Sequence, residues 1–290
     1  MATLRQIRRR IRTVENTAKI TKAMELVAAS KMRRAQNNAL AGRPYAEKVR
    51  SVLIDLAETL PSLDAETLHP LLQRREPKTM DIILITPDRG LCGGLPSALN
   101  RHAASFTVER GLPARIISIG RKGRDFFRRA GSPIVAEVVG LADYPTYEEV
   151  LPVAQVAIQD YIAGLCDEVY LIYALFVNTM VQRPEVLKLL PVEPPVRSGT
   201  PPVDYIYEPS REAVLAELLP RYVERQVYGA VLEAKASEQS ARMVAMRSAT
   251  DNAEEMIHDL TLMYNKVRQE SITKELLELV GGAEILRQAR

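Results

Sequence analysis

The chain has 290 residues, of which 47% are hydrophobic and 26% are charged, with a formal net charge of +3. These values are typical of a soluble globular protein that can bury a sizeable core. The longest apolar run, residues 169–177, is far shorter than the roughly 20 residues that a membrane-spanning helix needs. The first residues are charged from Arg5 onward and show no apolar signal segment. We therefore expect membrane association only through partners.

The two cysteines and the charge distribution constrain the chain further. Cys92 and Cys166 have neither metal-binding nor redox spacing, so we expect unpaired thiols in a reducing compartment. Residues 1–50 carry 13 bases and 3 acids, a net charge of +10, which leaves −7 for the remainder. A basic segment of this kind predicts an acidic partner. Charge alone leaves nucleic acid, an anionic membrane and an acidic protein surface open.

The first region, residues 3–59, has the periodicity of one long helix. Apolar residues recur at spacings of three and four: Ile7, Ile11, Val14, Ala18, Met24, Val27, Ala28, Met32 and Ala35. A disturbance is expected at Gly42-Arg43-Pro44, which holds the region's first glycine and first proline. A helix of this length would extend about 80 Å.

The second region, residues 78–208, alternates short apolar runs with helical patterns. The predicted strands are rich in β-branched residues and are continuously apolar: 80–86, 114–119, 133–139 and 168–178. The predicted helices lie between them: 95–110, 121–130 and 146–164. Such alternation predicts a largely parallel, Rossmann-like sheet covered by helices. The proline-rich segment 184–209 predicts edge strand and loop.

The third region, residues 210–290, predicts a second long helix that begins after Ser210 and extends on the order of 100 Å. Pro220 is expected to kink it or to divide off a short initial helix. Small residues and methionines in 234–253 match those in 23–35, so we expect an irregular antiparallel coiled coil with the longer helix projecting at one end. The predicted fold is therefore α/β: N-terminal coiled-coil helix 1–60, α/β middle domain 78–208 and C-terminal coiled-coil helix 210–290.

The glycine-rich segment 88–94 follows a predicted strand and precedes a helix, where a phosphate loop would lie. It has neither the dinucleotide fingerprint nor the Gly-Lys-Ser/Thr of nucleotide hydrolases. A tight structural turn is favoured over anion binding at the helix start. The same holds for Gly120-Arg121-Lys122-Gly123, where a solvated turn is favoured.

No catalytic constellation is visible in the sequence. The three histidines, His69, His102 and His258, are scattered over the three regions, and no zinc spacing exists. The acids of the middle region are expected to be helix-start residues: Asp143, Glu148 and Glu149. We predict no catalytic residue, no metal and no cofactor.

The last twenty residues are largely apolar, through Ile272, Leu276, Leu277, Leu279, Val280, Ile285 and Leu286. They lie where the third helix should project beyond its partner. An uncovered apolar segment needs another protein around it, or else it folds back on the middle domain. Composition weighs these alternatives about evenly.

Several long segments resemble, in order, the gamma subunits of F-type ATP synthases. The segments are ITKAMELVAASKM at 20–32, DRGLCGG at 88–94, MVAMRSATDNA at 243–253, YNKVRQ at 264–269, and ITKE at 272–275 with GGA at 281–283. The resemblance covers nearly the whole chain. It implies a non-catalytic rotary central stalk that couples proton flow through a membrane ring to ATP synthesis or hydrolysis in a catalytic hexamer.

The resemblance also implies partners and contact residues. The partners are the alpha and beta subunits, the epsilon subunit and the membrane rotor ring, on the cytoplasmic face of a bacterial plasma membrane. Positions matching contacts to the catalytic subunits are Lys22, Met24, Arg268, Gln269 and Thr273. Positions matching the foot, which faces the membrane ring, are Arg43, Tyr45, Tyr205, Tyr207 and Glu208.

The chain also departs from that family. Pro96 stands where the family often has Asn, which weakens an anion role for the preceding loop, and Pro220 is unusual in the C-terminal helix. The cysteine-bearing insertion of chloroplast relatives is absent, so we expect no thiol switch. No transit peptide precedes the first helix, which favours a bacterial source.

Two other functions compete with the stalk. A nucleotide-dependent α/β enzyme with helical arms would need a phosphate loop and a catalytic group. A nucleic-acid-binding coiled coil would explain the basic first segment and predicts salt-sensitive duplex binding. However, that segment has one aromatic residue, Tyr45, and no known reading motif. We expect no nucleic-acid partner.

Overall fold

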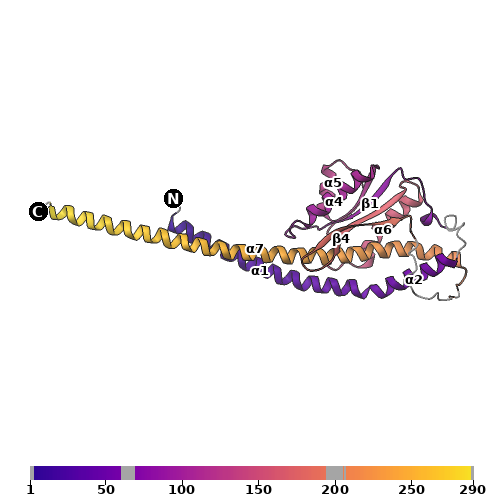
Figure 1. The fold of residues 1–290 in the computed structure, drawn as a ribbon, viewed down its shortest axis with the longest axis horizontal. Helices are drawn as coiled ribbons and strands as arrows, with labels where there is room; N and C mark the ends of the chain where they lie inside the picture. Colours follow the sequence, from indigo (N-terminus) through magenta and orange to yellow (C-terminus); the bar gives the residue numbers. More distant parts are fainter. Residues whose placement is uncertain (1–2, 60–68, 194–204, 206, 289–290) are drawn as a thin grey trace. The chain divides into compact units, whose positions relative to one another are not determined.

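The computed structural model describes residues 3–59, 69–193, 205 and 207–288, without the side chains of residues 43, 57–59 and 281–288. The described residues form two compact units, one from residues 1–27 and 245–290 and the other from 28–244. Two long helices contribute to both units (Figure 1): α1, Leu4–Ala41, and α7, Arg211–Gln288.

The helical unit is a pair of antiparallel segments of α1 and α7. The buried hydroxyls of Thr21 and Thr250 are 2.7 Å apart, and the guanidinium of Arg8 lies 5.8 Å from the ring centre of Tyr264. Residue numbers therefore fall along α1 as they rise along α7, which confirms the predicted antiparallel pairing. At 1.5 Å of rise per residue, α7 continues past the start of α1 from about residue 268 onward.

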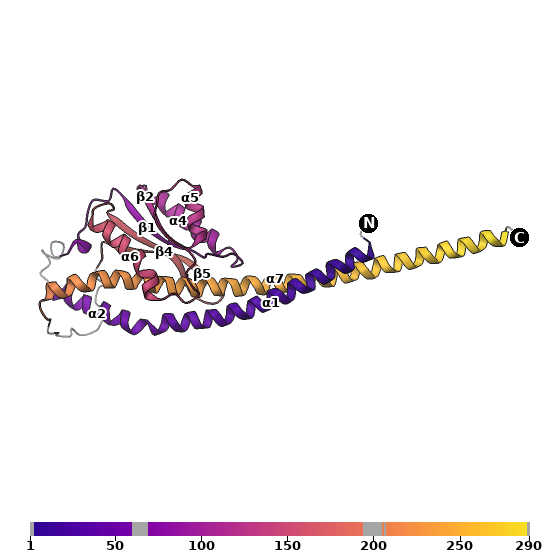
Figure 2. The same cartoon turned by 180° about the vertical axis from the view of Figure 1, so that it is seen from behind.

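The second unit contains a five-stranded sheet in the order β3-β2-β1-β4-β5. The strands are β1 Met80–Ile85, β2 Ala114–Ile119, β3 Ile134–Val138, β4 Glu168–Phe176 and β5 Gln182–Leu190. The first four are mutually parallel, and β5 pairs antiparallel with β4 at the edge (Figure 2). The order reverses direction between β1 and β4. The predicted strands are confirmed, including the edge strand that carries Pro184, where a missing N–H is tolerated.

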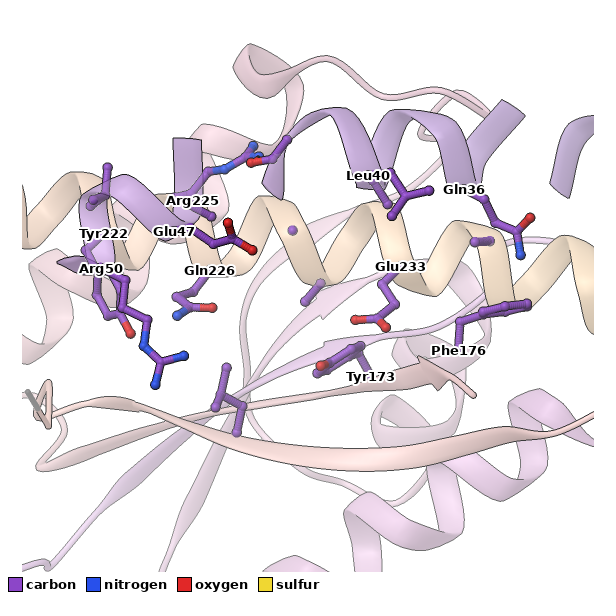
Figure 3. Close-up of a pocket in the computed structure, with 18 of the residues that line it drawn as sticks. Gln36, Leu40, Glu47, Arg50, Tyr173, Phe176, Tyr222, Arg225, Gln226 and Glu233 are labelled. Atoms are coloured by element: carbon purple, nitrogen blue, oxygen red, sulfur yellow. The ribbon is translucent and has the colours of Figure 1, made fainter. Parts of the chain in front are cut away.

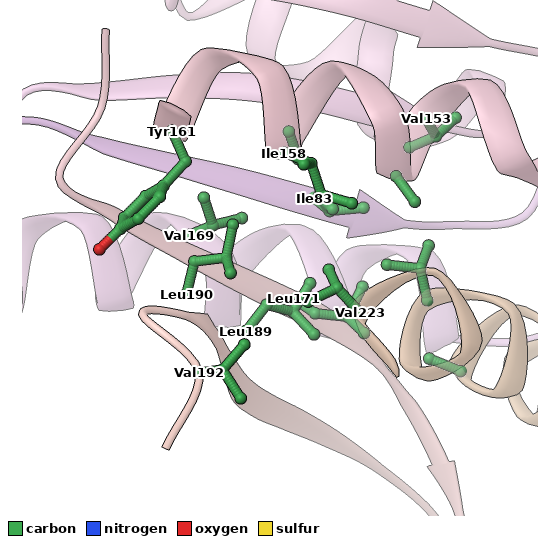
Figure 4. Close-up of a cluster of buried hydrophobic side chains, with 14 of the residues drawn as sticks. Ile83, Val153, Ile158, Tyr161, Val169, Leu171, Leu189, Leu190, Val192 and Val223 are labelled. Atoms are coloured by element: carbon green, nitrogen blue, oxygen red, sulfur yellow. The ribbon is translucent and has the colours of Figure 1, made fainter. Parts of the chain in front are cut away.

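Helices cover both faces of this sheet, because alternate strand residues point to opposite sides. Ile82 and Leu84 pack in one cluster with residues of α4, Leu95–Arg110, and α5, Arg121–Arg129. Ile83 and Ile85 pack in a second cluster (Figure 4). That cluster also holds residues of α2 Arg43–Thr59, the short helix η1 Pro70–Leu72, α6 Tyr147–Ile162 and α7. The unit is therefore a three-layer α/β arrangement.

The predicted disturbance near Gly42 is confirmed, because α1 ends at Ala41 and α2 begins at Arg43. The Gly42 carbonyl accepts one hydrogen bond from the backbone N–H of Ala46 at 3.3 Å and a second from Nη2 of Arg225 at 2.6 Å. A Cβ at Gly42 would lie 1.9 Å from that nitrogen. Pro44 follows at the second position of α2, where no helical N–H partner is needed.

Of the kink or division expected at Pro220, the division is wrong, because α7 runs through this residue as one helix of 78 residues. Leu219 and Val223, on either side, are each 1% exposed and belong to the main core cluster. Burying two such side chains contributes about 3–6 kcal/mol. That packing offsets the roughly 3 kcal/mol that an interior proline costs. Ser210 begins the helix as predicted, with its hydroxyl accepting from the N–H of Ala213 at 3.2 Å.

Candidate functional site

The crevice outside the carboxyl ends of β1 and β4 is the expected ligand site of this sheet, because the strand order reverses there. Open α/β sheets bind nucleotides where the strand order reverses. Here α7 lies across that position, with Val231, Ala234, Lys235 and Glu238 lining it. The volume left is about 10 Å³, whereas small-molecule sites need about 300–1,000 Å³. The chain's own helix fills the place that a cofactor would take.

Polar contacts hold α7 in this crevice. The Ser237 hydroxyl donates to the carbonyl of Ala174 near the end of β4 at 2.9 Å, and Nζ of Lys235 donates to the carbonyl of Leu141 at 3.3 Å. Arg242 and Glu238, both on α7, form an ion pair at 2.7 Å, and Nη2 of Arg242 also donates to the carbonyl of Gly90 at 3.5 Å. Residues 236–241 are all buried, although Glu238 and Gln239 are polar. A helix buried on every side is an integral part of the core.

The contacts of the two glycine-containing segments, 88–94 and 120–123, favour tight structural turns over anion-binding sites. The Asp88 carboxylate accepts from the backbone N–H groups of Arg121 and Gly140, each at 3.0 Å. An internal carboxylate therefore takes an amide at the start of α5 that an external anion would need. Gly120 has φ +99°, and a Cβ there would lie 1.8 Å from the carbonyl oxygen of Thr86. This glycine is required by close backbone approach.

Asp143 is not a helix-start residue, because α6 begins at Tyr147. Its carboxylate bonds Nζ of Lys31 on α1 at 2.6 Å and accepts from Nε2 of Gln239 on α7 at 3.1 Å. Partial burial opposes ionisation, yet the hydrogen bond and charge of Lys31 hold the pKa of Asp143 below its usual value. Lys31 is 112 residues away, so local pattern did not predict this pair.

The other two acids follow the prediction. Glu148 and Glu149 lie in the first turn of α6, and the Glu149 carboxylate accepts from the backbone N–H of Thr146 at 2.8 Å. Such a contact satisfies an N–H that the helix itself leaves open.

The residues expected to contact catalytic subunits fall into two groups in the helical unit. Lys22 is exposed and pairs with Glu25 at 2.9 Å, and Met24 is half-buried. Arg268, Gln269 and Thr273 are all exposed on α7. Because Thr21 lies opposite Thr250, the two groups are separated by roughly 30 Å or more along the helix axis. Gln269 and Thr273 line one shallow depression, and no described contact joins the two groups.

The residues expected at the foot all belong to the second unit. Nζ of Lys48 on α2 donates to the hydroxyl of Tyr205 at 2.8 Å, and this contact raises the pKa of Lys48. The ring centres of Tyr205 and Tyr207 are 6.1 Å apart. Tyr45 is 55% exposed beneath the guanidinium of Arg225, and Glu208 is exposed. The side chain of Arg43 lies outside the described residues.

In the same unit, a hollow of about 670 Å³ is lined by residues of α1, α2, α7 and the β4–β5 edge of the sheet. Figure 3 shows Arg50, Glu47 and Gln226 around it, with Glu233 beside Tyr173. Burial together with the Glu233 carboxylate raises the pKa of Tyr173. The polar lining of mixed charge selects no single class of ligand.

The apolar C-terminal segment is uncovered in the helical unit. The described apolar side chains between residues 272 and 280 are 48–71% exposed: Ile272, Leu276, Leu277, Leu279 and Val280. Ile285 and Leu286 lie outside the described side chains. Exposed apolar area of this extent is typical of a surface that binds another protein. No helix in the described ranges has the length and apolar character needed to cross a membrane.

Comparison with known proteins gives consistent matches along the whole chain. A model for the family described as ATP synthase matches residues 3–286. The ATP synthase gamma chain of Dehalococcoides mccartyi strain CBDB1 is 53% identical over 286 residues, covering 99% of this chain and all of the relative. That of Herpetosiphon aurantiacus is 54% identical over 297 residues, with the same coverage.

Solved structures agree with the sequence matches. A chain from the central stalk and c-ring of Tetrahymena thermophila mitochondrial ATP synthase is 26% identical with a TM-score of 0.60, covering 79% of this chain and 99% of that one. A chain of Euglena gracilis mitochondrial ATP synthase is 19% identical with a TM-score of 0.67, covering 98% and 94%. Because the second chain is only 19% identical, it supports the fold alone, and that fold is the one predicted from the sequence.

Proposed function

Because this chain belongs to the ATP synthase gamma chain family and is a central-stalk subunit, we propose that it has no active site of its own. It couples proton flow through a membrane ring to ATP synthesis or hydrolysis in the catalytic hexamer. Its partners are the alpha, beta and epsilon subunits and the ring. It lies on the cytoplasmic face of the bacterial plasma membrane, held there by those partners.

One observation carries the non-catalytic role. The crevice where a Rossmann-like sheet would bind a nucleotide retains only about 10 Å³, because α7 fills it. The same helix supplies the long exposed segment of the helical unit. A change in the position of α7 would therefore act directly on the sheet, as expected for a mechanical element.

The exposed surfaces support the proposed contacts. The apolar residues 272–280 would turn inside an apolar sleeve of the hexamer, together with Arg268, Gln269 and Thr273. Lys22 and Met24 would meet acidic segments of the catalytic subunits further along the shaft. Since a single exposed ion pair contributes only about 0–1 kcal/mol, torque would be spread over many such contacts.

The exposed ring of Tyr45 and the ring pair of Tyr205 and Tyr207 support the proposed foot. Tyr45, Tyr205, Tyr207 and Glu208, with Arg43, would face the epsilon subunit and the membrane ring. We also retain as a proposal the division into a coiled-coil helix 1–60, a middle domain 78–208 and a coiled-coil helix 210–290.

The test is to co-express this chain with the alpha and beta subunits of the same source and to measure assembly, ATPase activity and the torque of single rotating complexes. Two shortened or altered chains accompany it: one lacking residues 271–290 and one carrying Leu276→Glu/Leu279→Glu. Leu165→Glu, which changes an apolar side chain that is 54% exposed elsewhere, is the control.

We expect one copy of the chain per three catalytic subunits, turnover that depends on it, and loss of torque only in the altered C-terminal chains. ATP turnover by the isolated chain, or failure of the complex to assemble, would refute the stalk function. Equal torque from the truncated chain would refute the proposed bearing.

A further inference from the structure

A second basic surface lies on the outer helices of the sheet, apart from the basic first segment. α4 and α5 together carry seven bases and two acids, although residues 51–290 have a net charge of −7. Three of these bases are paired within the chain, Arg110 with Glu168, and Arg124 and Arg128 with Glu137. The side-chain charges of Arg101 and Lys122 pair with no residue that the structure describes. Unpaired positive charge is therefore concentrated between the two helices.

These two bases border a groove of about 790 Å³ between α4 and α5. On α4 its lining residues recur every three or four positions from Pro96 to Glu109, so the groove follows one helix face for about 20 Å. On α5 the lining residues Lys122, Phe126 and Arg129 lie on one face in the same way. The groove has the length of a helix of three to four turns.

The floor of the groove suits close approach of an apolar helix face. Small side chains, Ala104 and Ser105, leave room, while Phe126 and Val108 supply apolar surface, with Val108 being 79% exposed. Amphipathic helices bind such grooves through side chains spaced at three and four residues. The basic rim selects against a basic segment.

A buried polar atom of the lining is also unsatisfied. Nδ2 of Asn100 donates to the carbonyl of Lys122 at 3.2 Å, which fixes the amide orientation. Oδ1 of the same side chain has no hydrogen-bond partner among the described residues, although Asn100 is only 7% exposed. Buried polar atoms are normally paired, and this acceptor is an exception among the described residues.

From this geometry we infer that the α4–α5 groove docks an acidic amphipathic helical segment of a partner protein. Its apolar face lies on Ala104, Val108 and Phe126, and its carboxylates lie beside Arg101 and Lys122. This interaction is independent of the coiled-coil helices and of the crevice that α7 fills.

The binding test uses the full chain and a fluorescent 18-residue peptide with leucines at helical spacing and glutamates elsewhere, followed by anisotropy. The matched peptide carries lysine in place of every glutamate. Arg101→Glu/Lys122→Glu reverses the rim charge, and Ser105→Trp fills the groove without changing charge. Arg74→Glu/Lys78→Glu, at exposed positions outside the groove, is the control for net charge.

We expect the acidic peptide to bind, and both groove variants to weaken it at least about tenfold, while the control variant and the wild type bind alike. Equal binding by the groove variants, or equal binding of the lysine peptide, would overturn the inference. Association with vesicles of anionic lipid that requires Arg101 and Lys122, without peptide binding, would also overturn it and assign the groove to a membrane.

A second measurement uses the assembled complex. The photo-reactive residue p-benzoylphenylalanine replaces Ser97, an exposed residue at the border of the groove, and adducts are identified by mass spectrometry after irradiation. An adduct on an acidic helical segment of another subunit supports docking. An adduct on lipid, or none in a complex with normal ATPase activity, counts against it.

Discussion

The Ser237→Ala change tests how firmly α7 is attached to the sheet. The Ser237 side chain is fully buried and donates to the carbonyl of Ala174, which is itself 1% exposed. Ala174 lies opposite Pro184 in β5, and proline has no N–H to offer in exchange. Removing the hydroxyl leaves a desolvated carbonyl, which costs about 1–3 kcal/mol.

Ser240→Ala is a matched control, because Ser240 is also fully buried on α7 and donates to the carbonyl of Thr179 at 2.7 Å. That carbonyl keeps a second donor, Nε2 of Gln182 at 3.0 Å, and Thr179 is half-buried in a turn. The expected loss is therefore at most about 1 kcal/mol. The change in helix propensity from Ser to Ala is the same in both variants and cancels.

The measurement is urea unfolding of the full chain followed by near-ultraviolet circular dichroism. The chain has no Trp and 11 Tyr, of which only Tyr264 lies in the helical unit, so the signal reports the sheet-containing unit. We expect Ser237→Ala to lose about 1–2 kcal/mol more than Ser240→Ala at unchanged m value. Equal losses would refute the reasoning that acceptor burial decides the cost.

Two further predictions use the same unfolding assay. Gly120→Ala should cost more than about 3 kcal/mol, because its Cβ would meet the Thr86 carbonyl at 1.8 Å, whereas Gly131→Ala, with φ +76° and open space, should cost only the backbone strain of about 1–2 kcal/mol. Similar losses of unfolding free energy in the two variants would show that the loop rearranges to accommodate the Cβ of residue 120, and would contradict this prediction. The lowered pKa of Asp143 predicts a contribution that is present above the unfolded value of about 3.9 and is lost as the pH falls through the lower folded value. Asp143→Asn should therefore lower stability at pH 7 by less than about 1 kcal/mol, since the pair with Lys31 is partly exposed, and should not change it at pH 2. A loss that persists at pH 2 would contradict a charge-based role.

The sequence determined the elements and their order, because these depend on local periodicity and on glycine and proline. The limits predicted for residues 114–119 and 95–110 coincide with β2 and α4. The break at Gly42 and the start at Ser210 were also predicted. Each of these features depends on a few neighbouring residues, so a single chain displays it. Family membership followed from long matching segments for the same reason.

The tertiary structure decided what those elements do to one another. Continuity of α7 through Pro220 depends on burial of Leu219 and Val223 in a core built from distant strands. Asp143 was expected at a helix start and instead joins Lys31, 112 residues away. The sequence showed that no nucleotide motif was present, but only the packing showed that α7 fills the crevice. These outcomes depend on contacts between residues far apart in the chain, where burial and charge pairing override the local preference of each segment.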